Sequence, residues 1–498
     1  MIKVFCDKKE KDLKNFWSHI VFHPTDAIED DWGQAFLDKM AADKAVKTIR
    51  IYSMFEEMVT LDENGKMQFD FTKNDFRIDS LLEKGFDIFI AYAFIPFWLA
   101  ADQSPELCGE RYKGNILVRS KPYDYSLWEE ICRVYTQHLV DRYGEEQVGK
   151  WRLHCYNEPD WYHFFDKPAP DNYSRAMEYC KLYDAFARGV TSVSEKLCIG
   201  GPALAESPKN FEFFELFLNH IKEAGTRLDF ISFHSYGTFP ELIEDKTKPI
   251  DTRGAIFCTM TVARIADMCG FGHLPLVCDE WGAITEGYLD KERIPAMVFR
   301  ENELYAAYYV RMLTMFDELK LPYEQMMICL SGQHGLRGDF MGNRNFFTKS
   351  FYPKPLYNAY VLAAKLGEEK LHFYADLENE HVSVMPTKHK DGHCSVLMCY
   401  ADDGFALDLP TQNLEVNLAG LDGTYQVTQY VIDKDTANAY TKFVELGEPQ
   451  NATDEQKKAI RDAGALKPES LGTVSKESPC VALRMQNNAV VLLEIVPA

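Results

Sequence analysis

Short apolar runs recur along the first two thirds of the chain and are separated by stretches of a different pattern. Each run is rich in Ile, Val and Phe and is continuous rather than alternating, as is typical of strands buried on both faces of a parallel sheet. They lie at residues 19–24, 48–53, 87–96, 152–159, 196–203, 229–236, 275–282 and 325–332. These runs predict eight parallel strands.

The intervals between the runs have the spacing of amphipathic helices. Residues 126–144 place apolar side chains at helical intervals and end on Gly144. Residues 172–194, 211–225 and 301–319 show the same pattern. Eight strands alternating with helices favour an α/β fold of the (β/α)₈ TIM barrel type. An open α/β sheet with insertions is the alternative.

The pattern changes after residue 366. Short strands now alternate with turn residues such as Lys390-Asp391-Gly392, which predicts an accessory β-sandwich. A polar helical insert at residues 452–465 interrupts it. We therefore expect three parts, which are an N-terminal strand in residues 1–15 that joins the sandwich, a catalytic barrel in residues 16–365, and the C-terminal sandwich in residues 366–498.

Polar side chains follow three of the predicted barrel strands, at the carboxyl ends where barrel active sites lie. They are Asn157 and Glu158 after the fourth strand, His234 and Tyr236 after the sixth, and Asp279 and Glu280 after the seventh. Two carboxyl groups at equivalent points of a barrel are what glycoside hydrolysis with retention requires. One protonates the leaving oxygen, and the other, about 5–5.5 Å away, attacks the anomeric carbon.

Aromatic neighbours bear on the protonation of Glu158. Tyr156 and Trp161 flank it in the sequence. If they remove water from the carboxyl group, they raise its pKa, as a general acid needs near neutral pH. A negative charge on Glu280 acts in the same direction. Glu158 is therefore the candidate acid.

Longer stretches carry a family resemblance over nearly all of the chain, with the motifs in the same order. They are Asn157-Glu158-Pro159 and residues 76–100, 124–144, 199–203, 228–237, 354–360 and 430–456. They resemble glycoside hydrolase family 39, the β-xylosidase and α-L-iduronidase family of the clan A retaining enzymes. The resemblance implies that Glu158 is the acid/base and Glu280 the nucleophile. It also implies that Arg50 supports the nucleophile's carboxylate.

The same resemblance implies the substrate contacts. Asn157 matches the residue that binds the sugar 2-hydroxyl, and His234 and Tyr236 match a His-x-Tyr pair in which the His contacts sugar and the Tyr lies near the nucleophile. The candidate substrate-binding residues are Asn157, His234, Tyr236, Arg50, Tyr52, Tyr156 and Trp281.

Some positions depart from the family pattern. Tyr156 stands where a Trp is usual, Tyr52 where a His is common, and Trp281 follows Glu280 in CDEWGA where the xylosidases have Glu-Phe-Asn. Residues 331–334 lack the acidic side chains that grip xylose. These changes do not affect the expected reaction type, but they leave open which sugar the protein recognises. β-Xylosides are the leading expected substrates. The alternatives are an enzyme for α-L-arabinosides or iduronides, and a non-catalytic carbohydrate-binding barrel.

Three local ambiguities remain. Asp279 is a rival nucleophile, but alternation along the strand would then turn Glu280 away from the barrel axis. His234 could instead be a core histidine. Residues 336–339 and 342–345 form either a solvated loop or a loop over the cleft, in which Arg337 could bind an acidic sugar.

Composition limits the partners and the compartment. The net charge of −22 argues against nucleic acid and anionic membranes. No apolar run reaches about 18 residues, and the charged first residues lack the core of a signal peptide. Thirteen cysteines without CxxC pairs favour a reduced, cytoplasmic protein. We expect no cofactor and no metal, a glycoside substrate, and leave homo-oligomerisation open.

Overall fold

The computed structural model describes residues 1–498 except 113–114, 206–210, 239–251, 285–289, 321, 332–335, 377–379 and 406. Eight parallel strands close into a barrel, in which β13 returns to pair with β2. They are β2 (His19–His23), β3 (Thr48–Tyr52), β6 (Asp87–Tyr92), β9 (Arg152–Cys155), β10 (Cys198–Leu204), β11 (Phe230–Thr238), β12 (Leu276–Ile284) and β13 (Tyr323–Ser331). All eight predicted strands are confirmed, and the open-sheet alternative is wrong.

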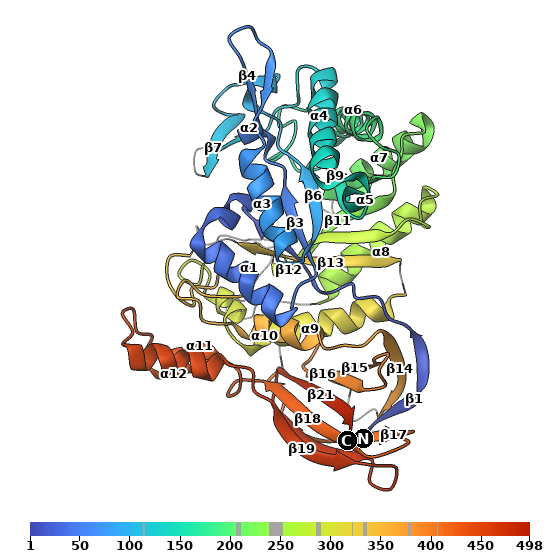
Figure 1. The fold of residues 1–498 in the computed structure, drawn as a ribbon, viewed down its shortest axis with the longest axis vertical. Helices are drawn as coiled ribbons and strands as arrows, with labels where there is room; N and C mark the ends of the chain where they lie inside the picture. The colour runs from blue at the N-terminus through green and yellow to red at the C-terminus, as the bar shows by residue number, and fades with distance from the viewer. Residues whose placement is uncertain are drawn as a thin grey trace.

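One main helix follows each barrel strand and covers the outside of the barrel (Figure 1). They are α1 (Asp31–Asp43), α3 (Thr72–Glu83), α4 (Tyr125–Tyr143), α6 (Asn172–Thr191), α7 (Phe211–Ala224), α8 (Arg253–Met268), α9 (Glu303–Glu318) and α10 (Pro355–Ala363). Local chemistry sets their ends. The Asp124 side chain accepts a hydrogen bond from the Ser126 amide at the start of α4, and Gly144 ends that helix at a φ of 85°.

Short helices and paired strands lie in the connections between the main elements of the barrel. They are α2 (Phe55–Met58), α5 (Glu145–Val148), the 3₁₀ helices η1 (Thr25–Glu29), η2 (Phe97–Leu99) and η4 (Pro295–Arg300), and the paired strands β4 (Val59–Leu61) with β5 (Met67–Phe69) and β7 (Cys108–Tyr112) with β8 (Asn115–Val118). None of these was predicted from the apolar pattern, because runs of three to six residues are too short to show a period.

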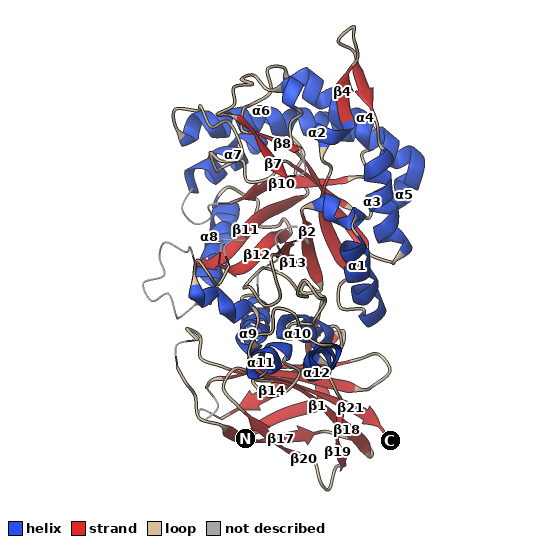
Figure 2. Cartoon of the chain, turned by 90° about the vertical axis from the view of Figure 1, so that its left-hand side faces the viewer, coloured by secondary structure: helices blue, strands red, loops and turns tan. Residues whose placement is uncertain are grey.

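A nine-stranded, mostly antiparallel sheet forms the second part of the molecule (Figure 2). It contains β1 (Ile2–Asp12), β14 (Glu369–Ala375), β15 (Val382–Lys388), β16 (Cys394–Tyr400), β17 (Gln412–Ala419), β18 (Tyr425–Ile432), β19 (Glu469–Val474), β20 (Cys480–Met485) and β21 (Ala489–Pro497). Side chains from all nine strands share one hydrophobic core, as in a sandwich. The N-terminal β1 pairs with β14 and β17.

Two further helices extend from the sandwich beside the barrel (Figure 1). They are α11 (Ala439–Glu445) and α12 (Asp454–Gly464). The second is the predicted polar insert, and a capping box of Thr453 and Gln456 begins it. The sequence pattern missed α11, which is only seven residues long.

Helix α9 joins the barrel to the sandwich. Its Arg311 Nε donates to Asp403 Oδ1 at 2.7 Å, and the Cys399 thiol of β16 donates to the Ala307 carbonyl at 3.4 Å. Leu397 and Leu492 of the sandwich belong to the same continuous hydrophobic core as the barrel. All thirteen cysteines are free thiols. Within the described residues, no helix has both the length and the apolar character needed to cross a membrane.

Candidate active site

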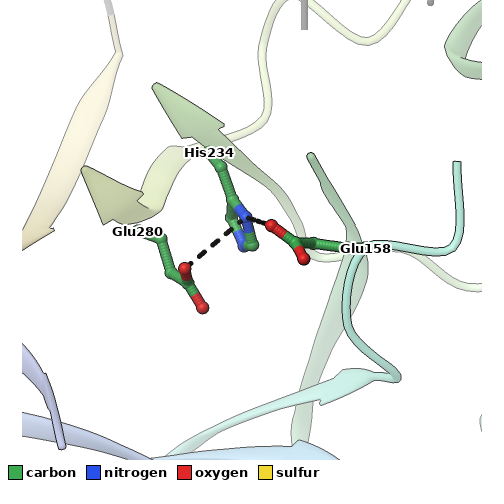
Figure 3. Close-up of side chains that lie close together, drawn as sticks. All are labelled: Glu158, His234 and Glu280. Atoms are coloured by element: carbon green, nitrogen blue, oxygen red, sulfur yellow. Dashed lines mark hydrogen bonds and ion pairs between the residues drawn. The ribbon is translucent and has the colours of Figure 1, made fainter. Parts of the chain in front are cut away.

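Glu158, His234 and Glu280 meet at the carboxyl ends of the barrel strands (Figure 3). Glu158 follows β9, His234 lies on β11, and Glu280 lies on β12. His234 Nδ1 is 2.8 Å from Glu158 Oε1 and 3.8 Å from Glu280 Oε2. One ligand atom from each of the three residues lies within 4.8 Å of the others. The parallel strands therefore bring both predicted carboxyl groups to one histidine.

The turn that carries Glu158 is held in an uncommon backbone conformation. Tyr156 and Glu158 have φ values of 66° and 49°. Each such residue costs about 1–3 kcal/mol and persists only where its surroundings fix it. Here the Tyr156 amide donates to the Tyr92 carbonyl at 3.1 Å, and the Glu158 amide donates to the Ala203 carbonyl at 3.0 Å. The neighbouring strands β6 and β10 thus set the direction of the Glu158 side chain.

Arg50, on β3, is fully buried and connects the polar groups below Glu280. Its Nη1 donates to Glu280 Oε1 at 2.8 Å, and its Nη2 donates to Asn157 Oδ1 at 2.7 Å. The predicted Arg50–Glu280 ion pair is confirmed. Because arginine only donates, Asn157 must present its oxygen to Arg50, which turns its amide NH₂ away from the guanidinium.

Two tyrosines complete the surroundings of Glu280. The Tyr236 hydroxyl donates to Glu280 Oε2 at 2.9 Å, which places it next to the predicted nucleophile. The Tyr52 hydroxyl lies 3.1 Å from both Glu280 Oε1 and Asn157 Oδ1 and can donate to either. Both oxygens of Glu280 therefore accept hydrogen bonds, which favours its charged form.

The two carboxyl groups have opposite pKa shifts. Burial raises the pKa of Glu158, and the charge of Glu280 adds to that rise, while the hydrogen bond and charge of His234 oppose it. Burial by itself would also raise the pKa of Glu280. The positive charges of His234, Arg50 and Arg344 outweigh it and hold that pKa well below its usual value. One carboxyl group thus favours the proton and the other the charge.

His234 is fully buried and lies among three carboxylates. Burial would lower the pKa of this imidazole, but the charges of Glu280 and Asp279 raise it to about 10. A charged imidazolium therefore faces both catalytic candidates. The alternative that His234 is only a core histidine does not account for these contacts.

Asp279 lies beneath Glu280 rather than on the opposite side of the strand. Asp279 Oδ2 is 3.1 Å from Arg50 Nη2, and Asp279 Oδ1 is 3.8 Å from His234 Nε2. The strict alternation that we expected along this strand is therefore wrong. The β11–β12 register shifts between Phe233 and His234, and such an irregularity lets consecutive residues share one face. Asp279 is fully buried, whereas the Glu280 side chain keeps 9% of its surface exposed.

Two predicted substrate contacts are corrected. The Trp281 indole is buried and stacks on Tyr309 of α9, with ring centroids 6.0 Å apart, so it faces away from the site. Tyr156 is also buried, and its hydroxyl donates to the Phe164 carbonyl at 3.1 Å. It supports the turn that carries Glu158. In both cases the sequence showed that the residue was near the site but not which way its ring points.

Arg344 belongs to the site but was missed among the candidates. Its Nη1 donates to the Tyr236 hydroxyl at 3.1 Å. The sequence analysis left residues 342–345 as either a solvated loop or a loop over the cleft, and it named Arg337 as the residue that could bind a sugar. That side chain is 66% exposed and lies 3.7 Å from Asp290. Most of the predicted end of the eighth strand, residues 332–334, falls outside the described residues.

Two buried histidines were also missed. Arg50 Nε donates to His154 Nε2 at 3.2 Å, and burial together with the charge of Arg50 holds the pKa of His154 well below its usual value. His23, at the end of β2, packs edge-on against Tyr52 at 5.5 Å. Both lie within predicted strands, where a lone histidine carries no signal that distinguishes a site from a core.

Glu158, His234 and Glu280 have the residue types of metal ligands. Arg50 is bonded to Glu280, and Arg344 lies one hydrogen bond away from it through Tyr236. These two permanent positive charges oppose a bound cation. The arrangement fits proton transfer and nucleophilic attack better than metal ligation.

A barrel that brings one glutamate from its fourth strand and one from its seventh to a common site has the arrangement of a glycoside hydrolase. The model of the family described as Glycosyl hydrolases family 39 matches residues 1–477. The chain belongs to this family.

Individual relatives agree with this assignment. A Beta-xylosidase of Caldicellulosiruptor saccharolyticus is 25% identical over 520 residues, which cover 99% of this chain and 98% of that protein. The Alpha-L-iduronidase of Homo sapiens is 26% identical over 205 residues, which cover 39% of this chain and 28% of that protein. A monomeric beta-xylosidase from Caulobacter crescentus CB15 has a similar fold, with a TM-score of 0.81, 22% identity, and coverage of 100% and 99% of the two chains.

Proposed function

We propose that the protein is a retaining exo-glycosidase that acts on small oligosaccharides, with β-xylosidase-like activity. One observation carries the proposal: carboxylate oxygens of Glu158 and Glu280 lie within 4.8 Å of each other, and the two groups have opposite pKa shifts. This separation is close to the about 5–5.5 Å of retaining enzymes and short of the about 6.5–9.5 Å that inverting enzymes need for a water.

In the first step, Glu158 gives its proton to the leaving oxygen while Glu280 attacks the anomeric carbon, which breaks the glycosidic bond and forms a glycosyl-enzyme ester. Arg50 and Tyr236 hold Glu280 in its charged form and aim it. The Asn157 amide, turned by Arg50, is placed to donate to a sugar hydroxyl.

In the second step, Glu158 takes a proton from water, and that water displaces Glu280 from the sugar. The charged His234 stabilises Glu158 in the carboxylate form it has between the two steps. The anomeric configuration is retained because the carbon is inverted twice.

A panel of 4-nitrophenyl glycosides tests this proposal. We expect release of nitrophenol from the β-D-xyloside above the α-L-arabinoside, and proton NMR of the first product should show the β-anomer of the sugar. An α-anomer as first product would contradict retention. Turnover of none of the sugars would leave the carbohydrate-binding barrel as the better description.

A second candidate is an enzyme for acidic sugars, favoured by Arg344. Its guanidinium reaches the site through Tyr236, and a sugar carboxylate needs such a partner. One relative is named as an alpha-L-iduronidase. Adding 4-nitrophenyl uronides and an α-L-iduronide to the panel separates the candidates, because the acidic-sugar enzyme would turn over these substrates and not the xyloside.

A cytoplasmic location belongs to the same proposal. Thirteen free cysteines, most of them buried, fit a compartment that keeps thiols reduced. Cell fractionation tests it, and recovery of the protein outside the cytoplasmic fraction would contradict it.

A further inference from the structure

A buried ion pair lies beside the candidate site and contacts none of its proposed catalytic groups. Lys354 Nζ and Glu301 Oε1 are 2.7 Å apart, and both side chains are at most 1% exposed. Glu301 precedes α9, and Lys354 precedes α10. Burying such a pair costs much of what its attraction returns, so stability alone is a weak reason for it.

Both members of the pair bind the backbone of one loop. The Gly342 amide donates to Glu301 Oε1 at 2.6 Å, and Lys354 Nζ donates to the Asn343 carbonyl at 3.0 Å. Arg300 Nη1 adds a bond to the Gly342 carbonyl at 3.2 Å. Three charge-assisted hydrogen bonds therefore fix two consecutive residues, and each is stronger than a neutral bond.

Close packing fixes the same point. Gly342 has a φ of 88°, and a Cβ built there would lie 2.8 Å from the Met297 Cβ and 3.0 Å from the Met297 carbonyl oxygen. Only glycine permits both the conformation and the approach to η4. The loop thus lies directly on the element that carries Arg300.

The next residue but one along this loop is Arg344, which enters the site. It donates to the Tyr236 hydroxyl at 3.1 Å, and that hydroxyl donates to Glu280 Oε2 at 2.9 Å. A continuous path of hydrogen bonds and two peptide links therefore runs from the buried pair to the proposed nucleophile.

We propose that Glu301 and Lys354 are positioning residues, which hold the 342–343 backbone so that the Arg344 guanidinium meets Tyr236 and, through it, Glu280. This inference rests on the proposed function, because it assigns the pair a task in that reaction. The pair itself touches neither substrate nor reacting atoms.

The test compares two changes. Arg344→Gln removes the positive charge at the site. The double variant Glu301→Leu with Lys354→Met removes both charges of the pair together, because removing only one would leave the other buried without a partner. Loss of the Arg344 charge raises the pKa of Glu280. The acid limb of the pH–activity profile, where activity falls because Glu280 takes up a proton, should therefore move to a higher pH. We expect kcat/KM to fall about 10- to 100-fold in both variants, with this acid limb moved upward.

Combining the changes gives the decisive result. If the pair acts through Arg344, the triple variant has the acid limb of Arg344→Gln with no further shift. Equal, additive shifts would overturn the inference. So would an unchanged acid limb in the double variant when Arg344→Gln moves it.

Lys370→Met is the matched control. Lys370 forms a buried ion pair with Asp317 at the junction of β14 and α9, and Lys11 stays with Asp317 at 2.7 Å when Lys370 is lost. We expect this variant to unfold at lower temperature with its acid limb in place. A crystal structure of the double variant tests the inference without activity, because an Arg344 that still meets Tyr236 would overturn it. Failure of the proposed function is a separate result, in which the unchanged protein hydrolyses no glycoside.

Discussion

The ends of β9 and β12 each bring one glutamate to the same site, yet the surroundings of the two glutamates differ. Among the described residues, Glu158 accepts one side-chain hydrogen bond, from His234, and it lies in a turn with positive φ. Glu280 accepts from Arg50 and Tyr236, and the Tyr52 hydroxyl is also within reach to donate to it. The first is poised to hold a proton and the second to hold a charge. The number of donors around each carboxyl group, more than its burial, separates their proposed roles.

This difference has a structural origin. The donors to Glu280 come from β3 and β11, and Arg344 behind them comes from a loop after β13. The backbone amides of the turn after β9 instead donate to carbonyls of β6 and β10. The Glu280 carboxylate thus collects donors from across the barrel, whereas the turn that carries Glu158 is held by its neighbouring strands.

The largest effect is expected from removing the charge-holding member. Glu280→Ala should lower kcat/KM by roughly 10⁵-fold, because no ester can form. Azide should restore turnover by attacking the anomeric carbon from the vacated side, giving an α-glycosyl azide from a β-glycoside. The comparison variant is Asp279→Asn, which changes the rival nucleophile and keeps the Glu280 side chain. Normal activity of Glu280→Ala would contradict the assignment of Glu280 as the nucleophile.

Removing the proton-holding member should have a smaller effect that depends on the substrate. Glu158→Ala should lose roughly 10²- to 10⁴-fold on glycosides with poor leaving groups and far less on dinitrophenyl glycosides, which leave without a proton. Equal losses on both would contradict the role of the acid.

The pH dependence of activity tests the same difference between Glu158 and Glu280. Activity requires Glu158 protonated, so it falls as pH rises through the raised pKa of Glu158. It also requires Glu280 charged, so it falls only as pH drops through that lowered pKa. In Glu158→Gln, assayed on dinitrophenyl glycosides, the alkaline limb should vanish and the acid limb remain. An unchanged alkaline limb would assign it to another group.

The smallest effect concerns a single donor. Tyr236→Phe removes one hydrogen bond from Glu280 and the link to Arg344. The pKa of Glu280 should rise, moving the acid limb up by about one pH unit and lowering kcat/KM by about tenfold. Tyr183→Phe, which removes a hydrogen bond from a buried tyrosine of α6 to the Arg227 carbonyl, is the control and should leave this limb in place.

The local pattern of apolar residues was enough to predict the barrel, because strands buried on both faces have continuous apolar runs in the sequence. The same logic located Glu158, His234 and Glu280, since parallel strands end on one side. The family resemblance gave the correct partner for Arg50, which is Glu280. It failed for Trp281 and Tyr156, whose aromatic character suits a core as well as a cleft.

The order of strands and helices and the residues at the strand ends can therefore be predicted from the sequence. How those residues face one another depends on the tertiary structure. The register shift beside Asp279 put two consecutive acids on one face, and the buried Glu301–Lys354 pair fixed the loop of Arg344. Periodicity is a property of neighbours in the chain, whereas register and loop placement depend on contacts between segments far apart in it.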